Sequence, residues 1–132
     1  MFKEKQKLIP IVISSTLMII LFVFITLLSL APIQLSGSFG PIDVDKAYHV
    51  LAYFCLALPI PILRPRLTIW VALVIMVYGG LIELVQYSFG RQGSWADFLA
   101  NGIGAIFGVM IARFLGLRLF GSSKVLIKRT KS

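Results

Sequence analysis

The sequence has few of the residues that hold metals or form disulfides. Its 132 residues include one cysteine, one histidine and five acidic residues. The cysteine, Cys55, lies inside an apolar run, which excludes an intrachain disulfide and a thiolate metal cluster and predicts a packing role. The sequence also has no glycine-rich phosphate loop and no visible internal repeat, so a phosphate-loop enzyme and an inverted-repeat transporter are not supported.

Charged residues are scarce as well, whereas hydrophobic residues are abundant. Charged residues make up 14% of the chain, hydrophobic residues make up 58%, and the mean hydropathy is +0.94. Ordinary soluble domains of this size do not have this composition. Four membrane spans of about 20 residues each would use most of the chain. The composition therefore predicts a membrane protein without room for a soluble nucleotide-binding, protease or nucleic-acid domain.

Apolar runs predict an all-α fold with four transmembrane helices in a single domain, 1–132. Asp43 or Asp45 is expected to begin the second helix as its N-cap, and Pro59 and Pro61 to kink or end it. Residues 32–45 are rich in proline and glycine, which predicts an irregular outer loop. The predicted helices cover about residues 8–31, 46–63, 67–89 and 95–117.

The first apolar run has a competing interpretation as a signal peptide. Its basic start and the small residues around Ala31 are typical of such a peptide. The run is too long for one, however, and Pro32 directly after Ala31 disfavours cleavage. We expect the segment to be retained as a helix.

The positive charge reports orientation rather than a nucleic-acid partner. The chain has 13 Lys and Arg and a net charge of +8. The loop between the first and second spans and the loop between the third and fourth hold only Lys46 and Arg91. The positive-inside rule therefore places both termini and the turn at 64–66 in the cytoplasm. Most of the cations lie before the first span, between the second and third, and after the last: Lys3, Lys5, Lys7, Arg64, Arg66, Arg118, Lys124, Lys128, Arg129 and Lys131.

Polar side chains enter the predicted membrane on one face of each of three helices. Inserting a charged side chain at the bilayer centre costs about 3 kcal/mol of free energy, so such residues are expected to be paired or functional. Counting back from the outer helix ends puts Tyr53, Glu83 and Asn101 each about 7 to 10 Å below the boundary. We therefore expect the three faces to turn inward and form one pocket open to the outer side. The polar residues are Lys46, His49 and Tyr53, then Glu83 and Gln86 with Arg91 beyond them, and finally Asp97 and Asn101.

Small residues recur every fourth position along the last helix. Such a stripe lets another helix approach closely, and packing within the chain is favoured over a dimer interface. The stripe consists of Ala96, Ala100, Gly104, Gly108, Ala112 and Gly116.

Three ordered motifs over about residues 43–110 carry a family resemblance. They are Asp45-Lys46-x-x-His49-x-x-x-Tyr53, Glu83-x-x-Gln86, and Arg91-x-x-Ser94-x-x-Asp97-x-x-x-Asn101-x-x-Gly104-x-x-x-Gly108. In this order and setting the chain resembles the VanZ-like family of small bacterial membrane proteins, whose namesake is associated with resistance to the glycopeptide teicoplanin. The resemblance implies a role in the cell envelope, at the bacterial cytoplasmic (inner) membrane, but no mechanism.

Each candidate residue has a functional and a structural interpretation. Glu83, His49 and Asp97 are the catalytic candidates, as general acids or bases. Structurally, Glu83 would pair with Arg91, His49 would make an interfacial hydrogen bond, and Asp97 would form a capping box with Ser94. Tyr53 would be an interfacial aromatic residue. His49, Glu83 and Asp97 lack the tight spacing of zinc motifs, so neither a metal nor another cofactor is expected.

Three functions remain open. The first is a binding protein that recognises an envelope lipid, a lipid-linked cell-wall precursor or a lipoglycopeptide. The second is a small intramembrane enzyme acting on a polyprenyl-phosphate-linked substrate. The third is a structural subunit of an envelope complex. Membrane lipids are expected partners and the oligomeric state is open. The predicted ligand-binding residues are Lys46, His49, Tyr53, Glu83, Gln86, Arg91, Asp97 and Asn101.

Overall fold

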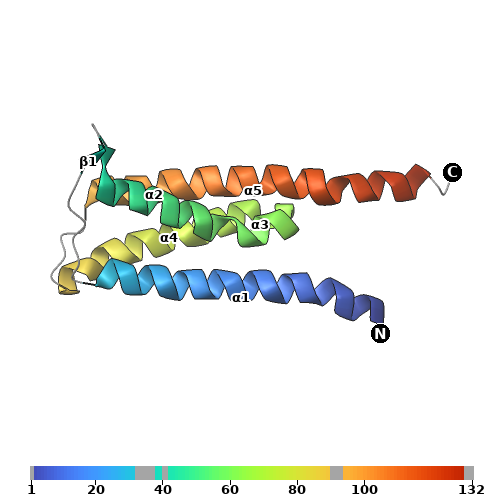
Figure 1. The fold of residues 1–132 in the computed structure, drawn as a ribbon, viewed down its shortest axis with the longest axis horizontal. Helices are drawn as coiled ribbons and strands as arrows, with labels where there is room; N and C mark the ends of the chain where they lie inside the picture. The colour runs from blue at the N-terminus through green and yellow to red at the C-terminus, as the bar shows by residue number, and fades with distance from the viewer. Residues whose placement is uncertain (1, 32–37, 40–41, 90–93, 130–132) are drawn as a thin grey trace.

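The computed structural model describes residues 2–31, 38–39, 42–89 and 94–129, which form a bundle of helices (Figure 1). Both chain ends lie at one end of the bundle, and the short strand β1 lies at the other, here called the β1 end (Figure 1). The elements in chain order are α1 (Phe2–Leu30), β1 (Ser38–Phe39), β2 (Ile42–Asp43), α2 (Val44–Ala57), α3 (Pro59–Leu63), η1 (Pro65–Leu67), α4 (Thr68–Gln86), η2 (Tyr87–Phe89) and α5 (Trp95–Arg129).

Four stretches of the bundle are long and apolar enough to cross a membrane. Large hydrophobic side chains cover much of the outer surface of these helices, as expected where lipid replaces water. The prediction of an all-α, four-span architecture is confirmed, and the chain is a multi-pass membrane protein. The spans are Pro10–Leu30, Val44–Leu63, Pro65–Gln86 and Trp95–Phe120.

The second span is broken where the prolines predict a break. Helix α2 ends at Ala57, the Leu58 N–H donates to the Cys55 carbonyl at 3.3 Å, and Pro59 begins α3. Proline has no N–H to donate to the preceding turn, and its ring clashes with the carbonyl four residues before it, so it kinks or breaks a helix. The other end of the span begins at Asp43, whose side chain accepts from the Asp45 N–H at 3.1 Å, as an N-cap should.

Two features differ from the sequence prediction. The segment 32–45 is not wholly irregular, because β1 and β2 pair antiparallel with Ser38 opposite Asp43, while 32–37 and 40–41 lie outside the described residues. Helix α5 continues to Arg129, beyond the apolar stretch that led us to end it near 117. Hydropathy measures the membrane-spanning length, and a helix can continue past the bilayer into water.

The small-residue stripe of α5 packs against the backbone of α2 and α3. A Cβ atom at Gly104 would overlap the carbonyl oxygen of Val50, and one at Gly108 would lie 2.6 Å from that of Phe54. Only glycine lets two helix backbones approach this closely. The prediction that the stripe serves packing within the chain is confirmed.

Helix α1 packs against α3 and α4 and is fixed by polar contacts. The Tyr78 hydroxyl of α4 lies 2.8 Å from Thr26 Oγ1 and donates to the Phe22 carbonyl at 3.2 Å. The side-chain amide of Gln86 donates to the Ser29 carbonyl at 3.0 Å, in the last turn of α1. Carbonyls in the last turn of a helix lack helical partners, so Gln86 acts as a cap supplied by another helix.

Candidate functional site

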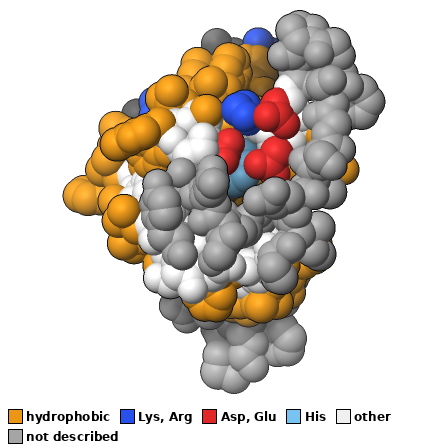
Figure 2. Space-filling view, turned by 90° about the vertical axis from the view of Figure 1, so that its left-hand side faces the viewer, with side chains coloured by type: hydrophobic (Ala, Val, Ile, Leu, Met, Phe, Trp, Pro, Cys, Tyr) orange, Lys and Arg blue, Asp and Glu red, His pale blue; other side chains and the backbone are white. Residues whose placement is uncertain are grey.

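The β1 end of the bundle collects most of the polar residues that the sequence singles out. Seen from this end, acidic, basic and histidine side chains gather in one area (Figure 2). His49, Glu83, Asp97 and Asn101 are buried, with exposed fractions of 9% or less. They come from α2, α4 and α5, so the expectation that three polar faces turn toward one another is met for these residues.

A chain of hydrogen bonds joins three of these residues across three helices. The side-chain amide of Asn101 donates to Glu83 Oε1 at 3.3 Å, and the Asn101 oxygen lies 2.8 Å from His49 Nδ1. An amide oxygen can only accept, so His49 Nδ1 carries a proton. In the neutral form of this tautomer, Nε2 is the ring nitrogen that carries the lone pair.

The second oxygen of Glu83 holds the start of α5. Glu83 Oε2 accepts the Ser94 N–H at 3.0 Å, while Ser94 Oγ accepts the Ala96 N–H at 3.1 Å. Ser94 is therefore a helix cap, as predicted, but the predicted capping box with Asp97 is wrong. Glu83 takes the N–H that Asp97 would have accepted, because α4 passes within hydrogen-bond distance of the start of α5. Asp97 is free to point elsewhere.

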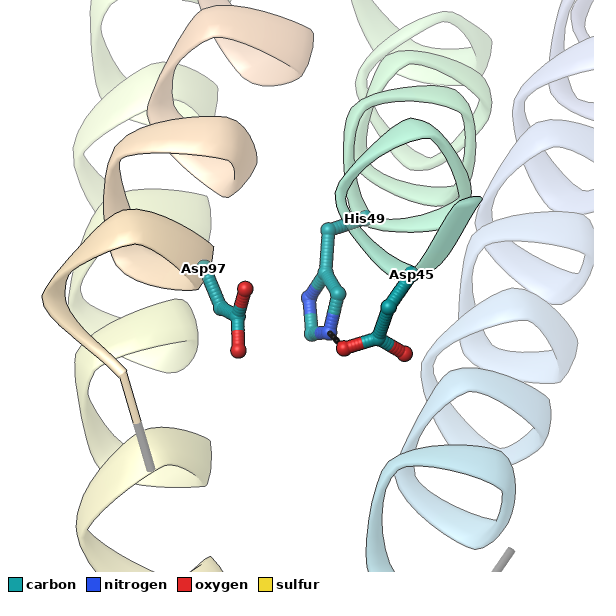
Figure 3. A group of neighbouring side chains, drawn as sticks. All are labelled: Asp45, His49 and Asp97. Atoms are coloured by element: carbon teal, nitrogen blue, oxygen red, sulfur yellow. Dashed lines mark ion pairs between the residues drawn. The ribbon is translucent and has the colours of Figure 1, made fainter. Parts of the chain in front are cut away.

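Asp97 faces a second cluster, formed with Asp45 and His49. The two α2 residues lie one helical turn apart, with His49 Nε2 3.9 Å from Asp45 Oδ2. Asp97 approaches the imidazole from α5, on its other side (Figure 3). Each of the three residues has a donor atom within 4.8 Å of the other two. From the sequence, His49, Glu83 and Asp97 were considered together as a possible metal site. In the structure, His49 and Asp97 do lie together, but the third member of the group is Asp45 and not Glu83.

Tyr53 lies deeper in the bundle, beside the same network. Its ring stacks on Tyr78, with centroids 5.9 Å apart, and a Cβ at Gly79 would lie 3.1 Å from Tyr53 Cε1 and 3.5 Å from Asn101. Among the residues that the structure describes, its buried hydroxyl has no hydrogen-bond partner. Tyr53 is thus a buried residue and not an interfacial aromatic one.

Two further predicted site residues, Lys46 and Gln86, make their contacts outside this network. Lys46 Nζ donates to Asp43 Oδ2 at 2.7 Å, and this contact, with the Asp45 N–H, holds the pKa of the Asp43 carboxyl below its ordinary value. Gln86 contacts α1 as described above. Arg91 lies outside the described residues, so its predicted pairing with Glu83 stays a prediction.

Glu83 also contributes to a pocket between α4 and α5. The pocket has a volume of about 430 Å³. By helical rise it extends about 10 Å along α4, from Val77 to Leu84. Apart from Glu83 and Ser94 its lining is apolar, contributed by Val77, Gly80, Leu81, Leu84, Trp95 and Phe98.

A known family model matches this chain. The VanZ/LLP1 family model matches residues 2–116, most of the chain. The chain belongs to the VanZ/LLP1 family. No curated protein and no solved structure matches it. In this VanZ/LLP1 protein the three motifs noted in the sequence lie on α2, α4 and the start of α5, and Asn101 of the third motif bonds to Glu83 of the second and His49 of the first.

Sequence reasoning missed two parts of this VanZ/LLP1 site. The apolar lining of the pocket was not predicted, although the Gly79-Gly80 pair in an otherwise bulky helix signals space beside α4. Asp45 was expected as a possible helix N-cap and as part of the first motif, but it was not predicted as a site residue. Its spacing of four residues from His49, on the same helix face, was the available signal.

Proposed function

We propose that this protein binds an envelope lipid, a lipid-linked cell-wall precursor or a lipoglycopeptide at the β1 end. The observation that carries the proposal is the pocket between α4 and α5, where a mostly apolar wall meets the acceptor Glu83. Ligand sites are generally apolar cavities with a few placed polar groups. A cavity on membrane-spanning helices is reached most readily by molecules that are already in the bilayer.

The lining indicates how such a ligand would lie. An acyl or isoprenoid chain would run along Val77, Leu81 and Phe98, toward the middle of the span. A headgroup that donates hydrogen bonds, such as a sugar hydroxyl or an amide, would meet Glu83. Trp95, which is 84% exposed, stands beside this end, where its ring would stack on a headgroup.

The sequence supplies the rest of the proposal. The cationic segments support an orientation with the β1 end on the outer face of a bacterial inner membrane. Lys46 and Arg91 belong to that side and would contact anionic groups of the ligand. Family membership supports an envelope role, and teicoplanin is one lipoglycopeptide that has the required apolar chain.

A second candidate function is catalysis on a polyprenyl-phosphate-linked substrate. The hydrogen-bond chain from Glu83 through Asn101 orients the His49 ring, and in the neutral tautomer Nε2 would be the nitrogen that acts as a general base. Turnover of such a substrate by the purified protein, lost in Glu83→Gln, would favour this candidate over binding alone.

Pocket occupancy tests the binding proposal. A Cβ at Gly80 would lie 3.5 Å from Phe98 Cε2, so the side chain of Gly80→Leu would fill the pocket. Val74→Leu on the same helix is the matched control, because Val74 is 54% exposed and outside the lining.

Native mass spectrometry of the three purified proteins would identify retained lipids. We expect wild type and Val74→Leu to retain the same specific lipid and Gly80→Leu to lose at least nine-tenths of it. Equal amounts of bulk phospholipid in all three would contradict the proposal and favour a structural subunit.

A further inference from the structure

A second feature of the β1 end lies outside the lipid pocket and is independent of the proposed function. Asp45, His49 and Asp97 bring two carboxylates and an imidazole together, each with a donor atom within 4.8 Å of the others. None of the three lines the pocket. Two carboxylates and an imidazole offer the oxygen and nitrogen ligand atoms that a divalent cation binds.

The burial of Asp97 is the observation that points to a ligand. Its side chain is 7% exposed, and among the described residues its Oδ1 atom has no hydrogen-bond partner. A buried carboxylate oxygen without a partner is costly unless it is paired or coordinates a metal. This carboxylate faces His49 (Figure 3), so whatever satisfies it would lie inside the cluster.

The nearby cation does not supply that partner. Lys46 Nζ donates to Asp43 at 2.7 Å, and its side chain is 41% exposed. Asp43 therefore holds this ammonium at the surface. The backbone N–H groups of Asp97 and Phe98 are likewise occupied, because both donate to the Ser94 carbonyl.

The orientation of His49 matches that of a metal-bound histidine. Histidine ligands usually donate the N–H of their free ring nitrogen to a second protein group, which fixes the tautomer and the ring plane. Here Nδ1 bonds to Asn101, which Glu83 orients in turn, and Nε2 lies on the side of Asp45. Asn101 would be a positioning residue, not a ligand.

We propose that Asp45, His49 and Asp97 bind a divalent transition-metal ion, with His49 coordinating through Nε2. A mixed set of one imidazole and two carboxylates suits Mn²⁺ or Zn²⁺ better than Mg²⁺ or Ca²⁺, which prefer oxygen ligands alone. Three protein ligands leave coordination positions open to water or to a further ligand.

Titration with Mn²⁺ and with Zn²⁺ tests the site directly. The full-length protein would be purified with a histidine-free tag, stripped with chelator and titrated by calorimetry in detergent. We expect one equivalent to bind to wild type and to Asp43→Asn, the control that alters a neighbouring exposed carboxylate. Asp97→Asn should weaken binding at least tenfold.

Spectroscopy of the wild type keeps the proposal testable if Asp97→Asn does not fold. The electron-spin-echo spectrum of bound Mn²⁺ should show nitrogen coupling from one imidazole. The proposal is overturned if wild type binds neither ion, if Asp97→Asn binds as wild type does, or if bound Mn²⁺ shows no nitrogen coupling. Because the readout is metal, these results are independent of whether the pocket binds lipid.

Discussion

Glu83 links the two halves of the site by using both of its carboxylate oxygens. One accepts from the Asn101 amide and the other from the Ser94 N–H, while the side chain also lines the pocket. A single residue thus orients His49 through Asn101, caps α5, and lines the pocket. Replacing Glu83 should therefore affect stability as well as binding.

Glu83→Gln is expected to lower the free energy of unfolding by about 1 to 3 kcal/mol. A glutamine presents one acceptor oxygen and one donor NH₂ group. It could accept from only one of the two N–H donors, Ser94 or Asn101, and its NH₂ group would face the N–H of the other. The thermal midpoint of the purified protein in detergent measures the effect.

The control for this change is Asp43→Asn. Asp43 is an exposed carboxylate, and asparagine also caps helices well. The thermal midpoint of Asp43→Asn should therefore stay close to that of wild type. If Glu83→Gln unfolds at the wild-type temperature, Glu83 is not held as a charged acceptor by these bonds.

The sequence predicted which residues meet but not how each is used. Intramembrane polarity is costly, and helical spacing put His49, Glu83, Asp97 and Asn101 on inward faces, with Glu83 and Asn101 at the same depth as Tyr53. Which oxygen meets which N–H depends on how the helices approach one another, to within an ångström. Spacing along a single helix carries no such information, so Asp97 was assigned to a cap that Glu83 forms instead.

At the scale of elements, the interface between α2 and α5 fixes the positions of His49 and Asp97. The stripe of small residues predicted this contact, and proline predicted the break between α2 and α3. The apolar pocket was not predictable in the same way, because Val77, Leu81 and Phe98 look like ordinary lipid-facing residues until the tilt of α4 against α5 is known.

Gly104→Ala should destabilise the bundle by about 1 to 3 kcal/mol, since the added Cβ would overlap the Val50 carbonyl oxygen and push α2 from α5. Gly102→Ala is the matched control on the same helix. Its Cβ would meet only the flexible end of Met76, at 3.4 Å, and alanine is the better helix former.

Thermal midpoints of the two alanine variants in detergent check this account of the interface. We expect a lower midpoint for Gly104→Ala and an unchanged or higher one for Gly102→Ala. Equal midpoints for the two variants would show that α2 and α5 do not depend on the close approach at Gly104.

At the scale of the whole molecule, orientation in the membrane decides which ligands can reach the β1 end. The cations predict that this end faces outward and the turn at Arg66 faces the cytoplasm. In a Cys55→Ser background, a membrane-impermeant maleimide should label Asp43→Cys in intact cells. It should label Arg66→Cys only after permeabilisation, and the reverse pattern would place the pocket on the cytoplasmic side.

The central claim is that the pocket between α4 and α5 selects one lipid class from the membrane. Photo-crosslinking in living cells tests this most directly, with a photoreactive phenylalanine analogue at Phe98 in the pocket. The matched position is Phe107 on the same helix, which is 57% exposed to lipid. We predict that position 98 captures one enriched envelope lipid, lost when Gly80→Leu is added, while position 107 captures bulk phospholipid. Capture of the same lipids in the same proportions at both positions would contradict the claim.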